Sequence, residues 1–185
     1  STTDVTERLL GAAVRRNQFT LEWEPWLAES WEISEDQRTI TYTLRDDIFF
    51  SDGEPITADD FVGTVNEIYY NEAVTSAGST RNSLRNAGGD SIWTQIDERT
   101  FSVELPNVYA GIFSLTSVAP MPMHIFRPVI EAEGAGAIDS FWGVDTDVSE
   151  IVGSGPWVVD EYIPSQRVVL GPNPYYYETD ANGTQ

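Results

Sequence analysis

The sequence contains no cysteine and no lysine, and it has a single histidine, His124. Without cysteine, neither a disulfide framework nor a thiolate metal site can form, and one histidine cannot supply a histidine-based metal cluster. No stretch approaches the roughly 20 consecutive apolar residues that a membrane-spanning helix needs. We therefore expect no cofactor, no bound metal and no direct membrane insertion of this segment.

Positive charge is also scarce. The 185 residues carry 10 basic side chains, all of them arginine, against 30 acidic ones, so the formal net charge is −20. Binding to phosphate backbones or anionic lipid headgroups relies on Lys and Arg, which excludes nucleic acid and membrane surfaces as partners. The acidity has two interpretations: generic solubility, or adaptation to high salt, where the repulsion between carboxylates is screened.

The chain has enough apolar residues for a folded core, since hydrophobic residues make up 41% of it and aromatic residues 12%. Residues Thr3–Arg16 have the apolar spacing of a helix. Thr39–Arg45 alternates polar and apolar residues, as a strand buried on one face does. Thr57 and Asp60 have the spacing of a capping box, which predicts a second helix that runs to about Asn71.

The rest of the chain predicts two β-hairpins and two short helices. The hairpins are Ile92–Ile96 with Phe101–Leu105, and Trp157–Tyr162 with Arg167–Leu170 around a Pro164-Ser165 turn. The helices are Val108–Leu115 and His124–Ala132, and Glu72–Ser91 has the composition of a long loop or a broken helix. Strands and helices alternate without a regular βαβ rhythm, which favours an α+β fold with a mixed or antiparallel sheet and flanking helices.

Patterns that could support catalysis or metal binding are weak. Adjacent acidic pairs such as Asp59 and Asp60 fit helix capping better than acid–base catalysis. The stretch from Asp145 resembles a calcium loop, but Glu150 stands where that loop needs glycine and Pro156 where it needs a bidentate glutamate. His124 lacks the partners of a nucleophilic triad. From these residues we predict no catalytic group and no metal ligand, and we expect that the protein is not an enzyme.

The six tryptophans and eight tyrosines allow two interpretations. They could form a platform on which a sugar or peptide stacks, or they could fill the core. Residues on alternating strands, such as Tyr42 and Trp157, fit the core better. Trp142 and the run Tyr175–Tyr177 follow no clean period, so we expect them at a surface or an interdomain contact.

Several short segments occur in an order that is typical of one protein family. They are Leu27–Asp36 (LAESWEISED), Thr39–Arg45 (TITYTLR), Phe50–Val62 (FSDGEPITADDFV), Pro122–Phe126 (PMHIF), Gly153–Trp157 (GSGPW) and Asn173–Tyr176 (NPYY). In these segments the chain resembles the extracellular solute-binding proteins of family 5, the peptide-, nickel- and oligosaccharide-capturing subunits of ABC importers. Ser154 and Trp157 depart mildly, because the family pattern has Thr and Tyr at these places.

The resemblance implies part of a periplasmic-binding-protein type II fold of class C. In such proteins two lobes close on a solute, and the closed form docks on an ABC permease without any bond being made or broken. Family members are longer two-lobed chains, so the resemblance implies a fragment of lobe one. Residues of about 20–150 would form its small subdomain, with flanking parts of the same lobe at 1–20 and 151–185.

The resemblance also suggests where a solute would bind. The segment after the strand that ends at Leu105 comes near the cleft in this family, the glycine-rich turn lies near the crossing between lobes, and an arginine is a possible partner for an anionic group. The predicted ligand-binding residues are Ser117, Val118, Ala119, Ser154, Gly155 and Arg85. For each of them ordinary loop packing is the alternative.

The leading functional hypothesis is a non-enzymatic solute-binding module for a small molecule or an oligopeptide. We expect it outside the cell membrane, extracellular or periplasmic, and tethered through a segment outside these residues. Ser1–Glu7 lacks the layout of a secretory signal, so export would require a signal already removed. Two other classes stay open: a fragment of a carbohydrate-active enzyme with an Asp/Glu pair beside aromatic platforms, and a structural surface-layer domain.

Overall fold

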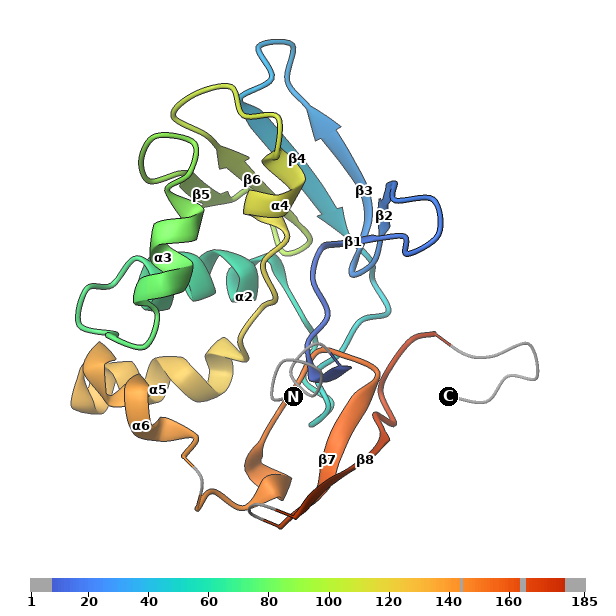
Figure 1. Ribbon diagram of the computed structural model, residues 1–185, viewed down its shortest axis with the longest axis vertical. Helices are drawn as coiled ribbons and strands as arrows, with labels where there is room; N and C mark the ends of the chain where they lie inside the picture. The colour runs from blue at the N-terminus through green and yellow to red at the C-terminus, as the bar shows by residue number, and fades with distance from the viewer. Residues whose placement is uncertain (1–7, 144, 164–165, 179–185) are drawn as a thin grey trace.

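A four-stranded antiparallel sheet in the order β3-β4-β6-β5 lies in the upper part of the view in Figure 1. Its strands are β3 (Ala28–Ile33), β4 (Thr39–Leu44), β5 (Ile92–Gln95) and β6 (Thr100–Glu104). The computed structural model describes residues 8–143, 145–163 and 166–178. The predicted strand at Thr39–Arg45 and the first predicted hairpin are confirmed.

The core lies on one face of this sheet. Ile40, Tyr42 and Leu44 alternate along β4 and are fully buried, as a period of two requires. The ring of Phe101 on β6 lies 4.8 Å from that of Phe61 and 5.8 Å from that of Trp93, both in stacked geometry. Such aromatic contacts stabilise a core beyond the apolar area that they bury.

Short helices cover the buried face of the sheet. They are α2 (Ala58–Gly63), which continues as the π-helix η1 (Thr64–Tyr69), α3 (Gly78–Leu84) and α4 (Ile112–Thr116). The Asp60 carboxylate accepts hydrogen bonds from the Thr57 amide at 2.9 Å and the Thr57 hydroxyl at 3.1 Å, so the predicted start of α2 is confirmed. The helix predicted at Val108–Leu115 begins later, at Ile112.

A second hydrophobic cluster lies below the sheet, around α5 (Met123–Glu133), η2 (Ala135–Ala137) and α6 (Ile138–Phe141). The helix predicted at His124–Ala132 is therefore confirmed. Trp142 is half-buried here, with its ring edge-on to Phe126 at a centroid distance of 4.9 Å. Asp139 of α6 accepts hydrogen bonds from the amides of Thr75 and Ser76, both at 3.0 Å, which attaches the loop before α3 to this cluster.

The N-terminal segment is a strand where the sequence predicts a helix. Strand β1 (Val14–Arg16) pairs antiparallel with β2 (Trp23–Pro25). The carbonyl of Ala13 also accepts the amide hydrogens of Trp26 and Ala28. The helix prediction for Thr3–Arg16 holds at Arg8 and Leu9, which are helical, and is wrong over Leu10–Arg16, because pairing with a later segment outweighs a local helical spacing. Residues 3–7 of that prediction lie outside the described residues.

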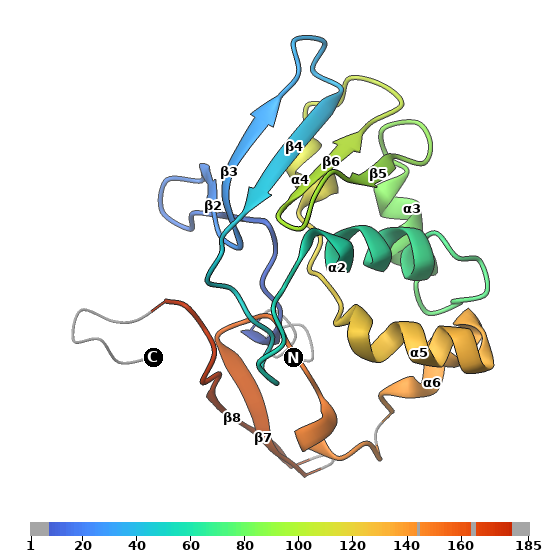
Figure 2. The ribbon, with the colours of Figure 1, turned by 180° about the vertical axis from the view of Figure 1, so that it is seen from behind.

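The third sheet is the hairpin of β7 (Trp157–Ile163) and β8 (Arg167–Pro172), which follows the 3₁₀ turn η3 (Val148–Glu150). Seen from either side, it lies at the end of the molecule opposite the β3–β4 turn (Figures 1 and 2). The second predicted hairpin is confirmed, while its Pro164-Ser165 turn lies outside the described residues. Trp157 is 37% exposed, so its assignment to the core is wrong: within the described residues, no further strand pairs with this hairpin.

Candidate functional site

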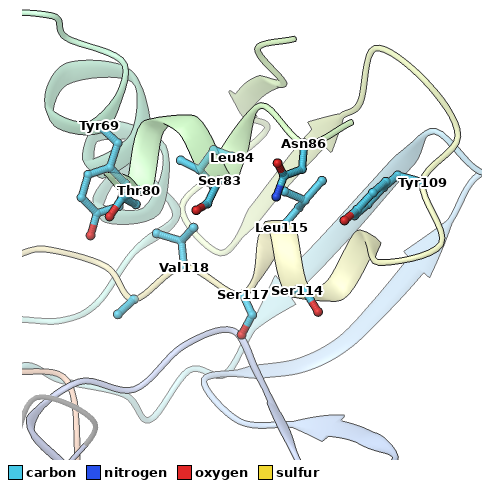
Figure 3. Close-up of a pocket in the computed structure, with 11 residues that line it drawn as sticks. Tyr69, Thr80, Ser83, Leu84, Asn86, Tyr109, Ser114, Leu115, Ser117 and Val118 are labelled. Carbon is cyan, nitrogen blue, oxygen red and sulfur yellow. The ribbon is translucent and has the colours of Figure 1, made fainter. Parts of the chain in front are cut away.

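A hollow of about 290 Å³ opens between α3 and α4 (Figure 3). Tyr69, at the end of η1, lies at one end of it, and Tyr109, in the loop before α4, lies at the other. Between them α3, the turn after it, α4 and the segment after α4 supply the walls. The lining residues are Tyr69, Thr80, Ser83, Leu84, Asn86, Tyr109, Ser114, Leu115, Ser117, Val118 and Ala119.

The hollow is chemically neutral. None of the described residues that line it is acidic or basic, although 22% of the chain is charged. Burial raises the pKa of the Tyr69 phenol above its ordinary value, so this hydroxyl stays protonated at neutral pH. The walls thus offer hydroxyl and amide groups, which can both donate and accept hydrogen bonds, together with two aromatic rings.

Several of these polar groups are available to a ligand. Within the part of the chain that the structure describes, the hydroxyls of Tyr69, Tyr109 and Ser114 and the side-chain amide of Asn86 have no hydrogen-bond partner. The Ser117 hydroxyl, in contrast, donates to the Val14 carbonyl at 2.7 Å. The first four groups can therefore serve a bound molecule, while Ser117 ties the wall to β1.

Local backbone features hold the walls in place. The Asn107 side chain donates to the Ala87 carbonyl at 2.9 Å, which connects the loop after β6 to the turn after α3. A methyl group at Gly111 would lie 2.6 Å from the ring of Tyr109, so a larger residue here would displace that ring from its position. The Tyr109 end of the hollow and the turn after α3 are thereby held in place.

Three of the predicted ligand-binding residues come together in this hollow: Ser117, Val118 and Ala119 all line it. Val118 is 8% exposed, so most of its side chain packs into the core and only its edge reaches the surface. That these residues contact a solute stays a prediction.

Arg85 lies beside the hollow but outside its lining. Its guanidinium already pairs with Asp90, at 2.5 Å and 3.4 Å, and with Glu72 at 3.4 Å. These carboxylates raise the pKa of Arg85 above its ordinary value, first through the hydrogen bond to Asp90. An anionic solute would have to displace them, and the predicted role of Arg85 remains untested.

Ser154 and Gly155 lie elsewhere, at a crossing with the N-terminal segment. The Ser154 hydroxyl, 1% exposed as a residue, accepts the Gly11 amide hydrogen at 2.9 Å and donates to the Gly11 carbonyl at 3.1 Å. The Gly155 amide donates to the Leu9 carbonyl at 2.9 Å. In the structure both residues thus form hydrogen bonds with the backbone of the N-terminal segment. Their contact with a solute stays a prediction.

Sequence reasoning missed most of the hollow, above all Tyr69, Asn86, Tyr109 and Ser114. These residues come from separate elements and follow no shared period, so no local pattern could single them out. The one available signal was the resemblance, which directed attention to the segment after Leu105 and hence to one wall.

Other polar clusters do not assemble a reactive site in the described residues. His124 Nε2 lies 2.7 Å from the Asp52 carboxylate, with the ring of Phe50 beside it. Within the described ranges, no three His, Cys, Asp or Glu side chains are grouped so that they could hold a metal ion. None of the helices described is both long enough and apolar enough to cross a membrane.

The fold matches part of the fold of type II periplasmic binding proteins. The chain superimposes with a TM-score of 0.82 on the periplasmic binding protein MelB from Agrobacterium fabrum C58, solved in complex with stachyose. The two are 24% identical, and the match covers 98% of this chain and 29% of that one. A likeness at this identity defines the fold, an α+β arrangement of antiparallel sheets with flanking helices.

The chain belongs to the bacterial extracellular solute-binding proteins of family 5, whose model for the middle region matches residues 22–184. It is 35% identical over 171 residues to a probable ABC transporter-binding protein of Deinococcus radiodurans. It is 28% identical over 167 residues to the periplasmic alpha-galactoside-binding protein of Rhizobium meliloti. These matches cover 91% and 87% of this chain but only 28% and 24% of the two relatives.

Proposed function

We propose that residues 1–185 form part of the solute-capturing subunit of an ABC importer. The observation that carries the proposal is an open hollow, lined by free hydrogen-bonding groups, on a fold that matches solute-binding proteins along 98% of this chain. The solute is a small molecule or an oligopeptide, and the protein holds it chemically unchanged. The relatives named above, which bind an alpha-galactoside or were solved with stachyose, support a solute of this size.

The domain assignment is part of the proposal. Residues of about 20–150 correspond to the small subdomain of lobe one, and 1–20 and 151–185 to flanking parts of that lobe. The four-stranded sheet and both hydrophobic clusters lie almost entirely within the first range, whereas β7 and β8 form a sheet of their own. This separation supports a boundary near residue 150.

Capture then works by closure of two lobes around the solute. A solute that contacts both lobes favours the closed state by its differential affinity for that state. The hollow at Ser117–Ala119 supplies contacts from one side, and the remaining lobe supplies the others. The closed protein delivers its solute to a membrane permease, and it works outside the membrane, extracellular or periplasmic and tethered to the surface.

The proposal is tested by binding measurements on the full protein that contains these residues. A panel of neutral oligosaccharides, short peptides and nickel is titrated by calorimetry, and bound solute is recovered and weighed by mass spectrometry. We expect micromolar or tighter binding of at least one class, with the solute recovered intact. Failure of the whole panel to bind would contradict solute capture and favour a structural surface-layer domain.

Two comparisons separate the competing classes. Turnover of a glycoside by the full protein would favour the enzyme hypothesis over capture. Residues 1–185 alone should bind the same solute far more weakly than the full protein, because affinity depends on contacts from both lobes. Equal affinity of the short chain and the full protein would contradict the two-lobe proposal.

A further inference from the structure

We infer that the part of the solute that enters the hollow is uncharged and rich in hydroxyl groups, as in a neutral oligosaccharide. The inference rests on the proposed function and narrows it, because peptides and metal ions carry charges that the hollow cannot pair. It depends on three observations: which groups line the hollow, which charged side chains beside it are already paired, and the volume of the hollow.

An anionic group would find no cation in the walls. The arginines of α3 and of the turn after it, Arg81 and Arg85, both bind other groups. Arg81 is 5% exposed and donates to the carbonyls of Tyr69, at 2.7 Å, and Val74, at 2.9 Å. Arg85 pairs with Asp90 and Glu72. A buried carboxylate without a paired cation is costly, so a peptide carboxylate does not fit here.

A cationic group is equally unsuited to the hollow. None of the described lining residues is an aspartate, glutamate or histidine, the side chains that pair with ammonium groups or coordinate divalent metals. This holds in a chain with 30 acidic residues, and those that the structure describes lie outside the lining. A peptide amine or a nickel ion would lose its hydration without gaining a charged partner.

Hydroxyl groups, by contrast, match what the walls present. A sugar hydroxyl both donates and accepts, as do the free groups of Tyr69, Tyr109, Ser114 and Asn86. The two tyrosine rings stand at opposite ends of the hollow (Figure 3), and aromatic rings offer an apolar surface that suits the apolar side of a sugar ring. The walls thus offer hydrogen-bonding groups for the hydroxyls of an oligosaccharide and aromatic rings for its apolar surface.

The volume indicates how much of the solute is involved. Ligand pockets commonly measure about 300–1,000 Å³, and at about 290 Å³ the hollow lies just below that range. It therefore receives one end of a longer molecule. The rest of the solute would lie toward the second lobe, in line with capture by closure.

The experiment compares three probes on the full protein by calorimetry: stachyose as a neutral oligosaccharide, the dipeptide Ala-Ala, and nickel chloride. We expect micromolar or tighter binding of stachyose, and at least a hundredfold weaker binding of the other two. Tight binding of Ala-Ala or nickel without binding of stachyose would overturn this inference but leave solute capture standing. Failure of the wider panel described above would instead overturn the proposed function itself.

A matched pair of variants then locates the contact. Asn86→Ala removes a free amide from the hollow, whereas Asn82→Ala removes the same group from an exposed position of α3 outside the lining. We expect Asn86→Ala to weaken stachyose binding by about tenfold, the cost of a strong lost hydrogen bond, and Asn82→Ala to leave it unchanged. Both variants should keep the wild-type thermal midpoint. Stachyose binding that is equal in both variants would overturn the placement of the sugar in this hollow.

Discussion

The four-stranded sheet and the β7–β8 hairpin differ in how far their apolar side chains are exposed to solvent. In the sheet, Ile40, Tyr42, Leu44, Phe101 and Val103 are fully buried under a layer of helices. In the hairpin, Trp157, Tyr162, Val168 and Val169 are each between 37% and 41% exposed, and β7 and β8 pair only with each other among the described residues. One region is covered on its apolar face and the other is not.

The difference shows that a two-stranded hairpin does not bury its own apolar side chains. A sheet stabilises a domain when one face is packed against another layer, and an isolated two-stranded hairpin is marginally stable in water. The apolar side chains of β7 and β8 therefore fit a position against further protein. This agrees with a chain that spans only 28% of its Deinococcus radiodurans relative.

The sharpest test of this contrast is the loss of a core ring. Phe101→Ala removes the side chain that contacts the rings of Tyr42, Phe61 and Trp93, and we expect a loss of about 3–5 kcal/mol in the free energy of unfolding. Val168→Ala, in the hairpin, should cost less than about 1 kcal/mol. Urea denaturation of both variants measures the difference. Similar costs would mean that the hairpin is packed as tightly as the sheet.

The junction between the two regions should give the next largest effect. A methyl group at Gly155 would lie 2.6 Å from the Arg8 carbonyl oxygen and 2.7 Å from the Leu9 carbonyl carbon, and backbone cannot move aside as a side chain can. We expect Gly155→Ala to destabilise the protein by about 1–3 kcal/mol.

Gly78→Ala is the matched control, since nothing lies within 4 Å of the added methyl group. Gly78 is the first residue of α3, and the change there should stabilise the protein by about 0.4–1 kcal/mol, chiefly by reducing the freedom of the unfolded chain. Thermal denaturation compares the two glycine variants. A neutral Gly155→Ala would show that the crossing is looser than the contacts indicate.

A smaller, pH-dependent effect is expected where α6 holds the loop before α3. Hydrogen bonds from the side chains and amides of Ser76 and Thr75 lower the pKa of Asp139 well below its ordinary value. Because the folded-state pKa is lowered, this carboxylate stabilises the fold above its ordinary pKa, and the contribution is lost as the pH falls below about 4.

Asp139→Asn should therefore flatten the dependence of the thermal midpoint on pH in the acid range. Asp46→Asn, at an exposed carboxylate without a hydrogen-bond partner among the described residues, is the control and should leave the wild-type slope. Circular-dichroism melts at a series of acid pH values measure both. Equal slopes in wild type and Asp139→Asn would refute the stabilising role of this carboxylate.

The smallest effect concerns the whole molecule and tests the high-salt interpretation of its acidity. A net charge of −20 repels itself at low ionic strength, and this repulsion is screened over a few ångströms in molar salt. We expect the thermal midpoint to rise with KCl, by about 2–4 °C for each kcal/mol of repulsion relieved. A midpoint that is the same in dilute and molar KCl would leave only the solubility interpretation.

The parts of the fold that local pattern determines could be predicted from the sequence. Strand β4 and both long hairpins follow from a period of two, and the start of α2 follows from the spacing of Thr57 and Asp60. Strand β1 could not be predicted, because its pairing with β2 is decided outside its own sequence. Trp157 lies on a correctly predicted strand, but alternation cannot say whether another layer covers that strand.

The candidate site was predictable only in part. The family resemblance pointed to Ser117–Ala119, and these residues do line the hollow. Tyr69 and Tyr109, which stand at its two ends, come from a π-helix and a loop. The packing of η1, α3 and α4 against one another brings them to one surface, and that packing has no signature in the sequence.

The clasp between Gly11 and Ser154 has an architectural consequence. The two residues are 143 positions apart and share a pair of hydrogen bonds, so the two ends of the intervening chain are held together at one point. Segments whose ends meet in this way tolerate exchange and insertion between proteins. The C-terminal segment adds further contacts, since the Trp26 indole donates to the Tyr176 hydroxyl at 2.6 Å and the Tyr177 hydroxyl donates to the Trp26 carbonyl at 2.9 Å. An exchange of the intervening chain between relatives would therefore have to preserve the contacts of Trp26 as well as the pair between Gly11 and Ser154.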